Sequence, residues 1–221
     1  MVALIDKTIF TGSISLPISA DSQDETLLNE LIIEKQDYYL TKFLGAVELY
    51  NLQTDIAILG TGVATAQKWI DFLTGKDIVL TDKNGEDKTV HYDGFKTVLS
   101  FFVFYEYVKA YNEQMTSVGN VIQEMQNSTP SYPYRKLVNS YNTGIDKYGI
   151  DWENDFVSNS YFKYYYTSYF SSYEKWSINY NVERLRPTAY NFMQYMNGVL
   201  STNFPDWQFQ QFEGKINEFN I

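Results

Sequence analysis

Apolar residues recur at helical spacing along most of this chain, which predicts a mainly α-helical fold. The first helix is expected to begin at Ser22, which forms a capping box with Glu25, and to end at Gly45. The residues before it, 1–18, are expected to be extended. The pattern predicts further helical segments at 46–52, 63–73, 95–113, 134–148 and 189–200, with a loop at 53–62.

One segment reads as a β-hairpin. Residues 77–81 and 88–92 are strand-like, and Asn84-Gly85 between them is the dipeptide most typical of a tight hairpin turn. The acidic residues of this turn resemble a calcium loop only loosely, because Gly85 is the fourth residue from Asp82 and not the sixth. A hairpin turn explains them better.

The helix expected at 95–113 is apolar on most faces through its first half. A helix that is apolar all round is normally buried, so we expect it to be the central helix of the bundle. The later helix at 134–148 contains Gly144, where we expect an interruption.

A polar stretch over about 116–130 divides the chain by composition. We therefore expect a helical body over 1–130, with the hairpin inserted near 77–92. Residues 131–221 are rich in tyrosine and are expected to form a partly extended assembly arm. The predicted fold is thus a helical bundle with an inserted β-hairpin and an aromatic-rich C-terminal arm.

The end of the chain is unusually aromatic, although chain termini are commonly polar and frayed. These rings carry too much apolar area to remain in water, so the tail must pack on its own body or on a neighbouring subunit. We interpret this as a sign of assembly and not of catalysis. The residues expected at the assembly interface are Tyr190, Phe192, Phe204, Trp207, Phe209, Phe212, Phe219 and Ile221.

Composition narrows the possible functions. With 44% hydrophobic and 20% charged residues, the chain has the composition of a folded protein. Its net charge of −10 argues against wrapping a nucleic acid, which requires Lys and Arg. With no Cys and His91 as its single His, the chain offers no thiolate or His-rich metal site, and we expect no cofactor. No stretch predicts a membrane span or a signal peptide.

Two other functions remain open. His91 would need a nucleophile beside it to be catalytic, and we interpret it as a surface or hairpin-packing residue. Asp151 and Glu153 could provide the carboxylate pair of a hydrolase, although acid pairs are common in so acidic a chain. A tyrosine- and tryptophan-rich surface over 150–207 would also suit a carbohydrate-binding module.

The order of motifs resembles that of known structural proteins. An acidic-led capped helix closing at Gly45 is similar to the opening helix of the head–tail connector proteins of tailed bacteriophages. The later order resembles structural proteins of crAss-like phages of Bacteroidales, although the terminal motif has Asn220 where we expect Gly. The segments that carry this second resemblance are 69–75, the hairpin at 76–93, Gly94, 95–113, 116–119, 189–192, 204–207 and 216–221.

The resemblance implies a virion protein of the phage neck, made in the host cytoplasm. It implies a homo-oligomeric ring of about twelve copies that contacts the portal and other neck or tail ring proteins. Double-stranded DNA would pass through it without sequence-specific binding. No catalytic residues come with the resemblance. Deleting 187–221 is expected to abolish ring assembly and to leave the helical body folded.

Overall fold

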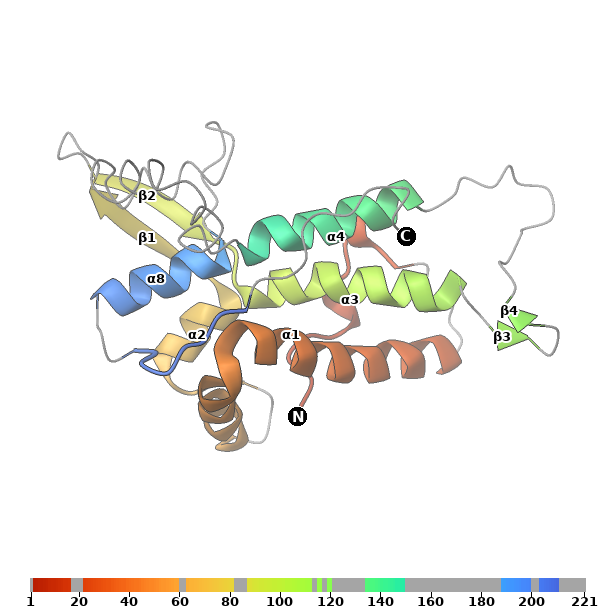
Figure 1. The fold of residues 1–221 in the computed structure, drawn as a ribbon, viewed down its shortest axis with the longest axis horizontal. Helices are drawn as coiled ribbons and strands as arrows, with labels where there is room; N and C mark the ends of the chain where they lie inside the picture. Colours follow the sequence, from red (N-terminus) through yellow and green to blue (C-terminus); the bar gives the residue numbers. More distant parts are fainter. Residues whose placement is uncertain are drawn as a thin grey trace.

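The computed structural model describes residues 2–16, 22–59, 63–81, 87–112, 115–116, 119–120, 134–149, 188–199 and 203–210. Within these residues the protein is mainly helical, and a two-stranded antiparallel hairpin is inserted between its helices (Figure 1). The predicted fold class is therefore confirmed.

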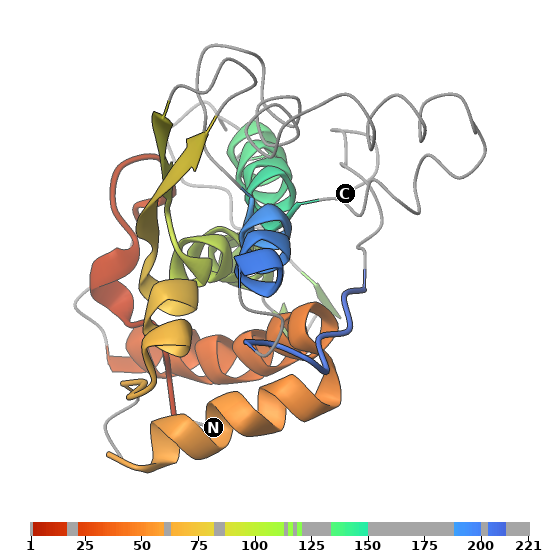
Figure 2. The same ribbon diagram turned by 90° about the vertical axis from the view of Figure 1, so that its left-hand side faces the viewer.

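The long helix α1 (Ser22–Ala57) is broken at Gly45, whose φ of 76° and ψ of 169° lie outside the helical region. The break turns the second half of α1 away from the first, and Figure 2 shows this half along the lower edge of the molecule. The expected helix end at Gly45 is thus a kink. The loop expected from residue 53 is wrong over 53–57, because Leu52 and Ile56 lie on the buried face of a continuing helix.

Helix α2 (Gln67–Thr74) leads into strands β1 (Lys76–Thr81) and β2 (Asp87–Tyr92), which pair in antiparallel register. The pair Ile78 and Val90 faces the core, whereas Val79 faces solvent. The predicted hairpin is confirmed. Its turn, with Asn84-Gly85, lies outside the described residues.

Helix α3 (Phe95–Asn112) occupies the centre, between α1 on one side and α4 (Tyr134–Tyr148) on the other (Figure 1). Its prediction as the buried central helix is confirmed, since it buries residues on most faces. Its fully covered side chains include Phe95, Val98, Leu99, Phe102, Val103, Phe104 and Tyr107. The short strands β3 (Met115–Thr116) and β4 (Gly119–Asn120) follow it.

Helix α4 runs through Gly144 without the expected interruption. A Cβ added at Gly144 would lie 2.8 Å from the Phe102 ring, closer than real Cβ contacts. Glycine therefore permits close packing of α4 against α3, and this packing outweighs its poor helix propensity.

The N-terminal segment, expected to be extended, contains the short 3-10 turns η1 (Lys7–Ile9) and η2 (Gly12–Ile14). The buried side chain of Gln36 on α1 fixes the start of this N-terminal segment in place through two hydrogen bonds. Gln36 accepts a hydrogen bond from the Leu4 amide and donates one to the Val2 carbonyl, each at 2.9 Å.

A single core crosses the division expected at residue 130. Ile145 and Tyr148 of α4 join it, and so do Ala189, Phe192 and Met193 of α8 (Ala189–Val199). The expected separation into a body over 1–130 and an arm over 131–221 therefore does not hold for the described residues, because both parts share one apolar core.

Candidate assembly site

The structure places five of the eight residues expected at the assembly interface. Tyr190 and Phe192 lie on α8. Phe204, Trp207 and Phe209 lie on an irregular segment, residues 203–210, which we call the strap. The remaining three, Phe212, Phe219 and Ile221, lie outside the described residues.

The two aromatic residues of α8 face the protein's own body. The Phe192 ring is fully buried and stacks on Tyr92 of β2, with centroids 4.2 Å apart and planes at 14°. Tyr190 is also buried, and its ring lies 4.6 Å from that of Phe209. Helix α8 therefore covers the core side of the hairpin, consistent with its position beside β1 and β2 in Figure 1.

The strap forms hydrogen bonds with the backbone of α1 at its kink. The last carbonyls of a helix have no partner within that helix, so those preceding the Gly45 break need donors from elsewhere. The amides of Gln208 and Gln210 donate to the carbonyls of Leu44 at 3.1 Å and Lys42 at 2.8 Å. The indole Nε1–H of Trp207 donates to the Phe43 carbonyl at 2.6 Å. Three successive carbonyls of α1 are thus satisfied by the strap.

Glycine at position 45 makes this close contact possible. A Cβ there would lie 2.8 Å from the Cβ of Gln208, and the φ of 76° is itself unfavourable for other residues. On the far side of the kink, the buried Glu48 accepts a hydrogen bond from the Asp206 amide at 3.2 Å. The strap is therefore bonded to both halves of α1.

The rings of the strap complete an aromatic core. Phe204 is 1% exposed and packs edge-on against Trp69 of α2, with centroids 4.9 Å apart. Trp207 and Phe209 are partly exposed, and their centroids lie 5.9 Å and 5.6 Å from that of Phe43. The Lys68 ammonium lies over the Phe204 ring at 4.9 Å and donates to a strap carbonyl.

These contacts correct the expected role of the C-terminal aromatic residues. Either the chain's own body or a neighbour could have covered them, and for Tyr190, Phe192 and Phe204 it is the chain's own body. Trp207 and Phe209 pack against the core and stay partly exposed. The three buried rings stabilise the monomer and are not open to a neighbouring subunit. Deleting 187–221 would consequently remove part of the core, so the body is not expected to stay intact.

Two buried tyrosines belong to the same core. Tyr148 on α4 donates its hydroxyl proton to the Gln210 carbonyl at 2.8 Å, and burial raises the pKa of this hydroxyl well above its usual value. Burial also raises the pKa of Tyr39, with a further effect from the Glu106 carboxylate. The Tyr39 ring stacks on Phe102 with centroids 4.2 Å apart.

A second feature of α1 was missed in the sequence pattern. The exposed positions of its second half carry no charged side chain. We call this surface, together with Ile58 in the turn that follows α1, the uncharged face, and it comprises Ala46, Val47, Tyr50, Asn51, Thr54, Ala57 and Ile58. The signal was present in the sequence, since Glu48 and Asp55 are the only charged residues in 46–66.

Both of these carboxylates are turned inward. Asp55 accepts hydrogen bonds from the Thr65 amide at 2.6 Å, the Thr65 hydroxyl at 2.6 Å and the Ala66 amide at 3.0 Å. Burial opposes ionisation of Asp55, but these hydrogen bonds together outweigh it and lower the pKa of the carboxyl below its usual value. They also explain why α2 begins at Gln67, later than the expected residue 63.

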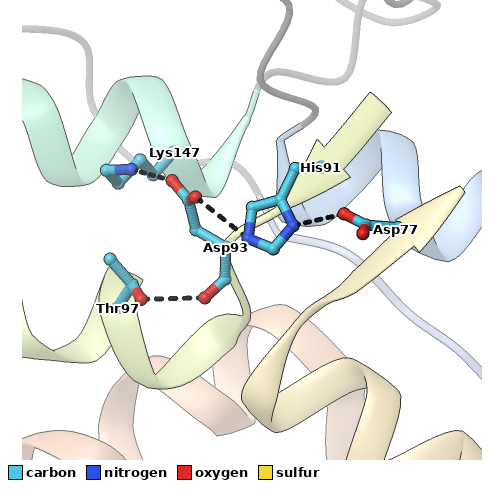
Figure 3. A network of polar contacts seen from close by, with 5 residues as sticks. All are labelled: Asp77, His91, Asp93, Thr97 and Lys147. Carbon is cyan, nitrogen blue, oxygen red and sulfur yellow. Dashed lines mark hydrogen bonds and ion pairs between the residues drawn. The ribbon is translucent and has the colours of Figure 1, made fainter. Parts of the chain in front are cut away.

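His91 lies in a polar network at the base of the hairpin (Figure 3). It is 61% exposed, with its Nδ1 2.6 Å from an Asp77 oxygen and its Nε2 3.7 Å from an Asp93 oxygen. Asp93 also pairs with Lys147 of α4, and its carbonyl accepts from the Thr97 hydroxyl at 2.9 Å. The network joins β1, β2, α3 and α4, as a structural tie would, in line with the hairpin-packing interpretation of His91.

Among the described residues, no group of three or more His, Asp and Glu side chains could hold a metal ion. No helix in the same part of the chain is long and apolar enough to cross a membrane. Asp151 and Glu153, considered as hydrolase carboxylates, lie outside the described residues, as does most of the 150–207 surface considered for carbohydrate binding.

Searches against protein-family models, curated proteins and solved structures found no match to this chain.

Proposed function

We propose that the protein is a structural component of the neck of a tailed bacteriophage. Copies of the chain assemble as a ring, which joins the portal vertex to the tail and lets double-stranded DNA pass. The observation that supports this proposal is the order of elements. A Trp69-bearing helix, a hairpin and an aromatic helix follow one another in the order that the resemblance to crAss-like phage proteins implies, after a first helix that kinks at Gly45 where the resemblance to connector proteins implies an end.

The charge of the chain fits a ring around DNA. A ring whose subunits each carry a net charge of −10 would repel the phosphate backbone. DNA would then slide through without adhering, which suits passage better than binding.

The closed core changes how copies would meet. Tyr190, Phe192 and Phe204 are covered within one chain, so contacts between subunits need another surface. Ring contacts are heterologous, which means that one face of a subunit meets a different face of the next. A folded body with a separate contact surface can meet this requirement without unfolding any part of its core.

The test is the mass of the assembled particle. The purified chain is measured by native mass spectrometry over a concentration series, alone and mixed with the portal protein encoded in the same genome. The expected result is a discrete high-order oligomer of about twelve copies, with negative-stain images of rings. A chain that stays monomeric at every concentration, and that does not bind the portal, would contradict the proposal.

A further inference from the structure

We infer that the uncharged face of α1 is a contact surface between copies of this chain. The inference rests on the proposed ring, and it names the part of the subunit that makes one side of the ring contact. Four observations support it: the distribution of charge along α1, the burial of the two carboxylates in its second half, the exposure of its apolar side chains and the rigidity of its backbone.

The two halves of α1 differ sharply in surface charge. In the first half, Glu30, Glu34 and Asp37 are exposed, as expected of a solvent-facing helix in an acidic protein. In the second half, every exposed position is apolar, a small residue or an uncharged polar residue. Both halves belong to one helix, so the contrast is not explained by secondary structure.

The two carboxylates in the second half of α1 form hydrogen bonds inside the protein. Glu48 is fully buried and bonds the strap, while Asp55 holds the start of α2. Neither projects onto the uncharged face. An approaching surface would therefore meet no fixed charge between Gly45 and Leu59.

The same face exposes large apolar side chains. Tyr50 and Ile58 are each 68% exposed, and Val47 is 47% exposed. Their spacing of three and eight residues places Val47 and Tyr50 on one side of the helix and Ile58 in line with them in the turn just after it, with Thr54 between Tyr50 and Ile58. Large apolar side chains that are exposed close together are candidates for a contact site on a protein.

A second copy is the partner that best fits a face without charge. Two chains that each carry a charge of −10 repel one another, and a contact that brings their carboxylates together would be penalised. The uncharged face lets one side of the contact approach a like-charged chain without bringing carboxylates of its own. A basic protein would instead be attracted to the exposed carboxylates of the first half of α1. A membrane surface is poorly suited, since the face has no Lys or Arg for anionic lipids.

The face is held rigid at both ends. The strap bonds α1 on both sides of Gly45, and Asp55 fixes its C-terminal end to the start of α2. Because its backbone is already ordered in the monomer, little conformational entropy is lost when a neighbour docks.

The experiment introduces a carboxylate on the face. Ile58→Glu and Tyr50→Glu are compared with Ile33→Glu, a matched control that lies on the acidic first half of α1 and is 43% exposed. Sedimentation velocity over a concentration series measures association, and circular dichroism melting checks the fold. We expect about tenfold or weaker association for both variants on the face and a change of less than about twofold for the control.

The possible outcomes distinguish a failure of the inference from a failure of the proposed function. If the unchanged chain never associates and does not bind the portal protein, the ring proposal fails, and the inference fails with it. If it associates and Ile58→Glu associates equally well, or if Ile33→Glu disrupts association as strongly, the inference fails and the ring proposal stands.

A crosslinking measurement covers the case of a variant that does not fold. The photoreactive p-benzoylphenylalanine replaces Tyr50, an exposed aromatic position that tolerates a larger ring. Illumination of the assembled protein should produce a species of twice the chain mass. Crosslinks only to another protein, or none in the assembled state, would overturn the inference.

Discussion

Replacing Phe204 by alanine tests whether the C-terminal aromatic residues stabilise the monomer. The ring is 1% exposed and packs against Trp69 at 4.9 Å and Phe72 at 6.5 Å, with the Lys68 ammonium over it at 4.9 Å. Burial of a Phe side chain contributes about 1.5–3 kcal/mol, and aromatic pairs add about 0.5–1.5 kcal/mol. Together with the cavity left behind, Phe204→Ala should cost about 3–5 kcal/mol.

That loss is a large share of a typical stability of about 5–15 kcal/mol. It should appear as a lower urea midpoint, and as a drop of roughly 10 °C in Tm for a chain of this size. The assay is urea unfolding followed by circular dichroism, at a dilution where the protein is monomeric.

The control is Tyr50→Ala, since this ring is 68% exposed and its loss should change monomer stability by less than about 0.5 kcal/mol. A Phe204→Ala penalty below about 1 kcal/mol in the monomer would refute the assignment of this ring to the chain's own core.

Three other predictions concern hydrogen bonds and protonation. Trp207→Phe removes the donor to the Phe43 carbonyl and should cost about 1–3 kcal/mol in urea unfolding, whereas an unchanged midpoint would mean that water replaces the indole. Asp55→Ala should lower the free energy of unfolding at pH 7. Because the pKa of Asp55 is lowered in the folded protein, the stability that its carboxylate contributes is present above the unfolded pKa and is lost as pH falls through the folded pKa. An equal loss of stability in the variant at pH 7 and at about pH 2 would contradict this prediction. Tyr39 and Tyr148 have raised pKa values, so stability should decline above about pH 10, where the unfolded chain releases these protons. The phenolate absorbance of Tyr39 and Tyr148 should then rise only as the protein unfolds. Ionisation of either tyrosine in the folded protein near pH 10 would contradict the prediction.

Local patterns in the sequence predicted local structure well. Asn84-Gly85 between two strand-like runs indicated the hairpin, and an apolar run after Gly94 indicated the buried helix α3. These features depend on neighbouring residues alone. The helix at Gly144 was misjudged because low helix propensity is outweighed by close packing on Phe102, a contact that spans 42 positions of the chain.

The candidate site could not be predicted in the same way. Aromatic residues near a chain end look alike whether they will pack on their own body or on a neighbour. The deciding contacts join Trp207 to Phe43 and Gln208 to Leu44, which are separated by 164 residues in the sequence. The uncharged face had a readable signal, since 46–66 contains only Glu48 and Asp55 as charged residues.

The strap also affects the order in which contacts can form while the chain is being translated. The carbonyls of Lys42, Phe43 and Leu44 leave the ribosome well before their partners in 207–210, which lie far later in the sequence. At ordinary elongation rates the gap is on the order of ten seconds or more. Until residues 207–210 have been made, the carbonyls at the kink of α1 lack these donors. A chain that stops before residue 207 therefore cannot form these hydrogen bonds.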